Sequence, residues 1–201
     1  MGGKRLEPVS LSPVRLRHGI SLSLVCALRH GGKVRPSPAA QPPAVTRKTL
    51  PLLDERLCLL VTVANSTRIY RNEQELWLHS PSAATEVLRP VLESWYRQQA
   101  WLYLPLRLRP LAEELGVRPS RITVRSQKTR WGSCSGSRTI SLNWRLMLLP
   151  SLLVDYVLAH ELCHLRHLNH SCRFWALLGT LIPDYRERRF ALRQTKASLP
   201  F

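Results

Sequence analysis

The chain has 201 residues, 44% of them hydrophobic, and its 30 Lys and Arg against 13 Asp and Glu give a formal net charge of +17. This length and hydrophobic content exclude a wholly disordered chain and predict a globular protein with a real core. The five cysteines lack the close, regular spacing of a disulfide-stapled module, so we interpret them as reduced thiols of a cytoplasmic protein. Because of the positive charge, polyanions must be considered as partners.

The first 48 residues are rich in Pro, Arg, Gly and Ser, and much of the positive charge lies there. Residues 1–50 contain nine Lys or Arg and one acid, Glu7. This composition predicts a disordered basic extension over residues 1–48, which could contact DNA or another polyanion. The apolar run from Ile20 to Leu28 is too short to cross a bilayer, so we expect no membrane contact.

Residues 49–120 carry the patterns of N-terminal strands followed by a helix. The runs at 57–63 and 75–79 are rich in strand-forming residues and are separated by polar residues, which predicts antiparallel strands in a small sheet. From residue 87 the apolar residues take helical spacing. This predicts a helix that is interrupted or kinked at Pro90 and Pro105 and ends at Gly116.

Residues 121–201 alternate strand and helix patterns. The segments 121–125 and 139–144 read as two strands, with the turn of a hairpin between them at 131–137. A helix is predicted to follow Pro150 with Ser151 as its N-cap, and two more helices are expected at 171–181 and 183–196. We therefore expect an α+β fold in which residues 49–201 form one compact domain.

Residues 160–164 read His-Glu-Leu-Cys-His, which is the HExxH pattern. One turn of helix places His160 and His164 on the same face, about 6 Å apart along the axis, so both imidazoles can reach one ion at about 2.0–2.1 Å. Glu161 borders that face, where its carboxylate can take a proton from a metal-bound water. The pattern predicts a Zn²⁺ site with His160 and His164 as ligands and Glu161 as general base.

A catalytic zinc site needs a third protein ligand, and two histidines could supply it. His167 shares the helical face, but it would lie about 10 Å along the axis from His160. His170 could return to the metal if Asn169 took a left-handed conformation and ended the helix. We favour His170 over His167, and we expect His167 to be a surface residue or a support for a ligand.

Four motifs carry a resemblance to a known family. They are Lys128–Cys134 (KTRWGSC), Ile140–Asn143 (ISLN), Asp155–Leu165 (DYVLAHELCHL) and Asn169–Ser171 (NHS), the last followed by Phe174 and Trp175. In this order they resemble the YgjP-like (SprT-related) zinc metallopeptidases from residue 121 to about 193. The resemblance implies a zincin-like fold, in which a small antiparallel sheet packs on the HExxH helix. It assigns His160, His164 and His170 as metal ligands and Glu161 as general base.

The sequence therefore predicts a zinc-dependent hydrolase that cleaves peptide bonds in a protein or peptide substrate. Two alternatives remain, a hydrolase of another amide or ester and a metal-containing nucleic-acid-binding module. Glu161 argues against the second alternative, because a structural metal site needs no carboxylate beside an open coordination position. Residues 131–134 could hold a substrate strand or could be a structural turn.

Overall fold

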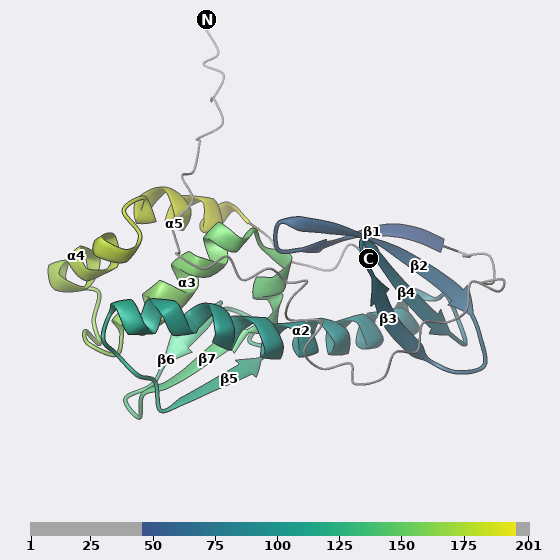
Figure 1. Cartoon of the computed structure of the whole chain (residues 1–201), viewed down its shortest axis with the longest axis horizontal. Helices are drawn as coiled ribbons and strands as arrows, with labels where there is room; N and C mark the ends of the chain where they lie inside the picture. Colours follow the sequence, from purple (N-terminus) through teal and green to yellow (C-terminus); the bar gives the residue numbers. More distant parts are fainter. Residues whose placement is uncertain (1–45, 196–201) are drawn as a thin grey trace, which may run out of the picture.

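The computed structural model of the chain describes residues 46–195, which form two sheets and a set of helices joined by one long helix (Figure 1). The elements in chain order are β1 (Thr46–Leu52), β2 (Glu55–Val63), β3 (Arg68–Asn72), β4 (Glu75–Ser80), α2 (Thr85–Glu114), β5 (Arg121–Arg125), β6 (Gly132–Cys134), β7 (Thr139–Asn143), the 3₁₀ helix η1 (Trp144–Leu148), α3 (Ser151–Cys163), α4 (Cys172–Leu181) and α5 (Tyr185–Gln194). Strand β1 begins at Thr46, slightly before the expected start near Thr49, and the rest of the predicted extension lies outside the described residues.

The N-terminal sheet has the strand order β1-β2-β4-β3 and is mixed. Strands β1 and β2 pair antiparallel, as do β3 and β4, but β2 and β4 run parallel. The prediction of purely antiparallel strands was therefore wrong. Strand β4 alternates buried and half-buried residues, with Leu76 and Leu78 fully buried, and this pattern suits a strand between two neighbours. The chain leaves β2, forms the edge strand β3 and returns as β4, which makes β4 parallel to β2.

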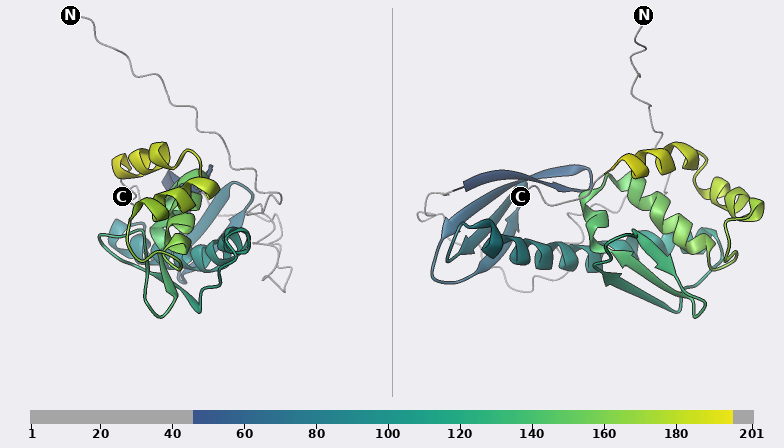
Figure 2. Two further views of the ribbon diagram at one scale, coloured as in Figure 1. Left: turned by 90° about the vertical axis from the view of Figure 1, so that its left-hand side faces the viewer. Right: turned by 180° about the vertical axis from the view of Figure 1, so that it is seen from behind.

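Helix α2 runs from Thr85 to Glu114 without a break, although Pro90, Pro105 and Pro110 lie inside it. The expected interruption at Pro90 and Pro105 does not occur. Buried side chains from Leu88 to Ala112 pack along its whole length, and this packing maintains a helix that loses several backbone hydrogen bonds at prolines. Leu115 is the C-cap residue of this helix, and Gly116 follows with φ of +61°, as expected for a glycine that ends a helix. The view from behind shows α2 joining the two ends of an elongated molecule (Figure 2).

The second sheet has the order β5-β7-β6 and is also mixed. Strand β6 pairs antiparallel with β7, whereas β5 pairs parallel with β7. The expected antiparallel sheet and the hairpin between 121–125 and 139–144 were therefore wrong, because residues 132–134 form a strand rather than part of a turn. The connection before β6 is fixed by Asn143, whose side-chain amide donates to the carbonyl oxygens of Gln127 and Arg130 at 2.7 and 2.9 Å.

Helix α3 starts at Ser151, with Pro150 and not Ser151 in the N-cap position. The backbone N–H of Ser151 instead donates to the Asp54 carboxylate at 2.9 Å, so an acid from the β1–β2 turn satisfies the helix N-terminus. Helices α4 and α5 follow close to their expected positions. Helix α3 contacts α2, α4, α5 and β6, which places it at the centre of this end of the molecule. Within residues 46–195, no helix is long and apolar enough to span a membrane.

A buried ion pair connects α3 to α2. The Arg107 guanidinium donates to both carboxylate oxygens of Asp155 at 2.7 and 2.8 Å, and only 1% of the Asp155 side chain is exposed. Removing one partner leaves the other charge buried without compensation. We expect Asp155→Ala to lower the free energy of unfolding by about 3 kcal/mol in urea denaturation. The double variant Arg107→Met/Asp155→Leu should recover most of this loss, and an Asp155→Ala variant as stable as wild type would contradict the assignment.

Candidate metal centre

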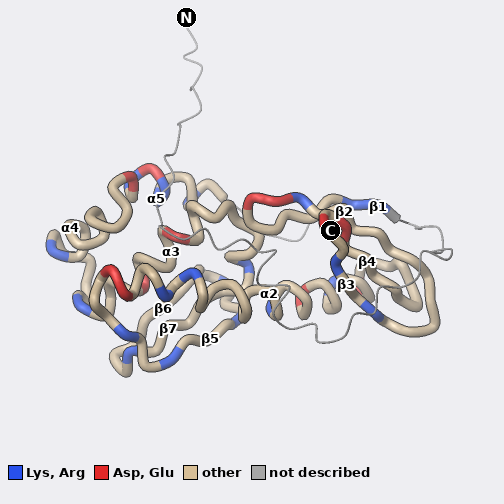
Figure 3. The backbone as a smooth tube through the Cα atoms, viewed as in Figure 1, with Lys and Arg blue, Asp and Glu red and all other residues tan. Residues whose placement is uncertain are grey.

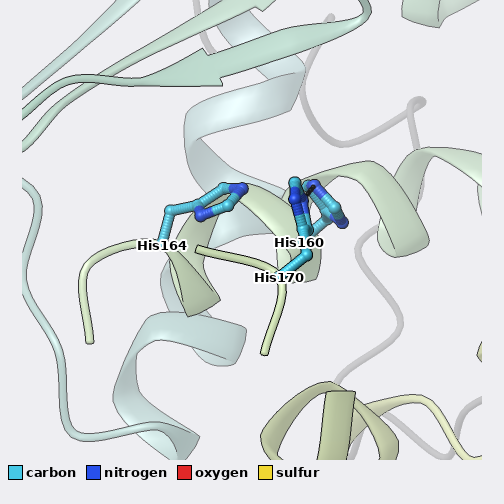
Figure 4. Close-up of side chains that lie close together, drawn as sticks. All are labelled: His160, His164 and His170. Atoms are coloured by element: carbon cyan, nitrogen blue, oxygen red, sulfur yellow. Dashed lines mark hydrogen bonds between the residues drawn. The ribbon is translucent and has the colours of Figure 1, made fainter. Parts of the chain in front are cut away.

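Three histidines come together at the C-terminal end of α3. His160 lies in the last turn of the helix, His164 is the C-cap residue, and His170 returns from the segment after the helix (Figure 4). Their candidate ligand atoms all lie within 4.8 Å of one another. The helical spacing explains the first pair, since residues four apart share one face.

The chain returns to the site by a different path from the one the sequence indicated. Helix α3 ends at Cys163, and tight backbone bonds from Leu165 to Leu162 and from Arg166 to Cys163 turn the chain away from the helix axis. Among the described non-glycine residues, only Leu53, Glu73 and Arg138 have positive φ, so the predicted left-handed Asn169 was wrong. Because the helix ends about five residues earlier than expected, His170 reaches the site from a loop.

His167 lies outside this group of imidazoles, but its backbone supports the group. The Nδ1 atom of His164 lies 3.1 Å from the carbonyl oxygen of His167. This contact fits the tautomer in which Nδ1–H donates, which leaves Nε2 of His164 for a metal. This contact uses only the main-chain carbonyl of His167. A main-chain contact of this kind could not be predicted from the residue type at position 167.

The donor set fits one metal ion. The Nε2 atoms of His160 and His170 lie 3.0 Å apart. Two imidazole nitrogens bound to one tetrahedral zinc at about 2.0–2.1 Å would lie roughly 3.4 Å apart, so this pair needs only a small adjustment. Burial, followed by the nearby His164 and His170, lowers the pKa of His160 to about 3. The His160 ring is therefore neutral at pH 7, as a metal ligand must be.

Aromatic rings surround the three imidazoles. The fully buried Phe174 places its ring centroid 4.9, 4.7 and 4.8 Å from those of His160, His164 and His170. Trp175 stacks on the His170 ring at 5.5 Å, and its Nε1–H donates to the His170 carbonyl oxygen at 3.0 Å. Phe174 thus packs against the whole centre, whereas Trp175 fixes both the ring and the backbone of His170.

Glu161 lies beside the centre, against strand β6. Only 5% of the residue is exposed, and burial raises the pKa of its carboxyl group to about 7, although the charge of Arg130 opposes this shift. Its side chain occupies the space beside Gly132, where a Cβ atom would lie 2.7 Å from both Cγ and Oε1 of Glu161. A residue larger than glycine at position 132 would therefore collide with the Glu161 side chain. The sequence did not predict this contact, because Gly132 and Glu161 lie on separate elements.

His160 and Glu161 line one pocket of about 270 Å³ between α3, α5 and the segment that leads into β6. Trp131, Gly132 and Tyr156 also line it. The candidate ligand and the candidate base therefore open onto the same space. A substrate group in this pocket would lie next to both of them.

Four other residues have side chains of types that can take part in catalysis, but in the structure these side chains serve packing or hydrogen bonding. Asn143 is buried and uses its side chain to hold the β5–β6 connection and to cap η1. Tyr185 stacks on Trp175 at 5.5 Å, and its hydroxyl accepts from Arg186. Cys163 is fully buried, and burial raises the pKa of its thiol to about 12. Burial also raises the pKa of Cys134, so neither thiol is activated as a nucleophile.

The comparison with protein families is the one that agrees with the sequence motifs. No curated protein matches the chain significantly. Among solved structures, the metallopeptidase zymogen abylysin of Pyrococcus abyssi matches with 22% identity and a TM-score of 0.39, over 47% of this chain and 99% of the abylysin chain. The model of the YgjP-like metallopeptidase domain matches residues 27–195, which extends well before the stretch that carries the motifs. The resemblance seen in the sequence is thereby confirmed, and the chain belongs to the YgjP-like metallopeptidase domain family.

Proposed function

We propose that the protein is a zinc-dependent peptidase that hydrolyses peptide bonds with Glu161 as its general base. The observation that carries this proposal is the opening of His160 and the buried Glu161 onto one pocket, with His164 and His170 beside them. Membership of a metallopeptidase family supports it. The same grouping supports a zincin-like arrangement, with the HExxH motif at the end of α3 and a small mixed sheet packed against that helix.

The three imidazoles would hold the metal, and a bound Zn²⁺ would polarise the peptide carbonyl and lower the pKa of water at the site. Glu161 would accept a proton from the attacking water and later give it to the amine that leaves. Its burial keeps it from bulk water and favours the protonated form, which suits the second step. A cation held by the imidazoles would favour the carboxylate, which suits the first step.

Strand β6 offers a place for the substrate main chain. It is one of the two edge strands of the second sheet, it contacts α3, and the Glu161 side chain fills the space beside its Gly132. A peptide added alongside β6 would use main-chain hydrogen bonds, so it would be held with little dependence on its sequence. The β6 residues would then have both a structural role and a substrate-binding role.

An experiment on the type of bond separates peptidase activity from other hydrolysis. The zinc-loaded protein should cut an unfolded protein such as casein at internal peptide bonds, and mass spectrometry should show new amino and carboxyl termini. A chelator should abolish the cuts, and added zinc should restore them. Hydrolysis of esters or side-chain amides without any new peptide termini would contradict the proposal and favour the alternative hydrolase. The expected contact between the basic extension and DNA concerns residues outside the described range and stays a prediction.

Gly132→Ala tests the contact between β6 and the base. The new methyl group would displace the Glu161 side chain, so we expect kcat for peptide cleavage to fall about 100-fold while zinc remains bound. Steady-state kinetics and metal analysis check this result. Gly136→Ala is the matched control, because a Cβ there meets nothing within 4 Å. Equal activity of the two variants would show that Gly132 does not position the base.

A further inference from the structure

The pocket beside the metal centre is strongly basic. Arg130, Arg189 and Arg193 line it, and Glu161 is the only acid among the lining residues in the described part of the chain. Arg130 comes from the segment before β6, whereas Arg189 and Arg193 lie four residues apart on α5 and so share one face of that helix. Three arginines from two separate segments of the chain therefore line one small pocket.

No carboxylate of residues 46–195 forms a salt bridge with any of these three arginines. Other arginines near this end of the chain have such partners, since Arg107 pairs with Asp155 and Arg188 with Asp184. Like charges that converge in a cleft repel one another and raise the local potential for an anion. Lys and Arg are spread over both ends of the molecule (Figure 3). Arg130, Arg189 and Arg193 are distinguished by lining the pocket that adjoins the candidate base.

Arg189 is held in a defined position. Its Cζ atom lies 4.7 Å from the ring centroid of Trp175, the same ring that stacks on His170. Stacking of the guanidinium plane leaves its N–H groups available for hydrogen bonds. Arg189 is also close enough to His160 to lower the pKa of that imidazole. One aromatic ring thus orients both a candidate metal ligand and a candidate anion-binding group.

We propose that Arg130, Arg189 and Arg193 form a subsite that binds a carboxylate of the substrate next to the bond that is cleaved. The carboxylate can come from an Asp or Glu side chain or from the free C-terminus of a peptide. Guanidinium groups bind carboxylates through paired, charge-assisted hydrogen bonds, and the same positive charge rejects Lys and Arg side chains. The inference rests on the proposed function, because it treats the pocket as part of the substrate site.

Binding can be measured without cleavage by using the zinc-loaded, full-length Glu161→Gln protein. Three peptides of one sequence, each with the same uncharged fluorophore at its N-terminus, would be compared by anisotropy: one neutral and C-terminally amidated, one amidated with an internal Glu, and one neutral with a free C-terminus. At least one carboxylate peptide should bind about tenfold more tightly than the neutral peptide. Tighter binding of the internal Glu peptide identifies a side chain as the source, and tighter binding of the free C-terminus identifies the terminus.

Variants separate this subsite from the general attraction of a chain with net charge +17. Arg189→Gln and Arg193→Gln should each remove most of the tenfold preference. Arg109→Gln is the control, because it removes the same charge from an exposed position on α2 outside the pocket. Arg193→Glu should shift the preference from a Glu peptide towards a Lys peptide, a reversal that simple loss of folding cannot produce.

The proposal is overturned if neither carboxylate peptide binds more tightly than the neutral one, or if Arg109→Gln reduces the preference as much as the pocket variants do. It is also overturned if a single-stranded oligonucleotide displaces the peptides better than an acidic peptide does and the same pocket variants abolish this effect, because the pocket would then bind phosphates. Cleavage of the three unlabelled peptides by wild type separates the subsite proposal from the proposed peptidase activity. If a carboxylate peptide binds more tightly but no peptide is cleaved, the subsite is supported and the peptidase activity is contradicted. If the peptides are cleaved but bind equally well, the peptidase activity is supported and the subsite is contradicted.

Discussion

Glu161→Gln is expected to lower kcat for peptide cleavage by about 10²–10⁴-fold, the usual contribution of a general acid–base group. Glutamine has nearly the same shape as glutamate and fits the space beside Gly132, but it cannot accept a proton from water. The three imidazoles are unchanged, so the variant should bind one zinc ion with wild-type affinity. Steady-state kinetics with a quenched fluorescent peptide, together with metal analysis, measure both quantities.

Stability should not decrease in this variant, because a buried carboxyl group is replaced by a neutral amide that needs no desolvation of a charge. Glu114→Gln is the control, since Glu114 is exposed at the end of α2 and should give wild-type kinetics. A Glu161→Gln protein that keeps more than about a tenth of wild-type kcat would rule out the proposed role of Glu161.

His170→Ala and His167→Ala are expected to differ sharply in zinc binding. His170 contributes an Nε2 atom 3.0 Å from that of His160, so its loss removes one of three ligands and should weaken zinc binding at least about 100-fold. His167 contributes only its backbone carbonyl to His164, and alanine retains that carbonyl. His167→Ala should therefore bind zinc within roughly threefold of wild type. Competition with a chromogenic chelator measures both affinities.

The opposite order, with His167→Ala losing zinc and His170→Ala retaining it, would show that His167 is the third ligand. Equal losses would indicate that the segment after α3 folds differently when metal binds.

Trp175→Phe offers an intermediate case, because it removes the indole hydrogen bond to the His170 backbone and keeps an aromatic ring beside the imidazole. Its zinc affinity should fall by about tenfold, as for other residues that orient ligands.

Helical periodicity explains how much of the site the sequence could predict. Residues 160, 161 and 164 lie on one helix, and their mutual positions follow from the rise and turn of an α-helix. The place of His170 depended on where that helix ends. The end is set by backbone hydrogen bonds after Cys163 and by packing of Phe174 under the imidazoles, and neither has a short-range signal in the sequence.

Contacts between distant segments account for what the sequence did not predict. Gly132 and Glu161 meet only because β6 lies against α3, and the parallel pairing of β5 with β7 depends on a crossing of the chain that strand patterns do not encode. Arg130 and Arg189, which are far apart in the sequence, likewise line one pocket. The continuity of α2 through three prolines arises from burial along its whole length, which outweighs local helix propensity.

Titration of the metal-free protein with zinc, with zinc uptake and peptide cleavage followed in the same samples of wild type and Glu161→Gln, tests the central claim most directly. Both proteins should take up one equivalent, and cleavage should rise in proportion to bound zinc and level off at one equivalent in wild type alone. Cleavage by the metal-free protein, or equal cleavage by the two zinc-loaded proteins, would contradict a mechanism in which the three histidines hold the metal and Glu161 is the base.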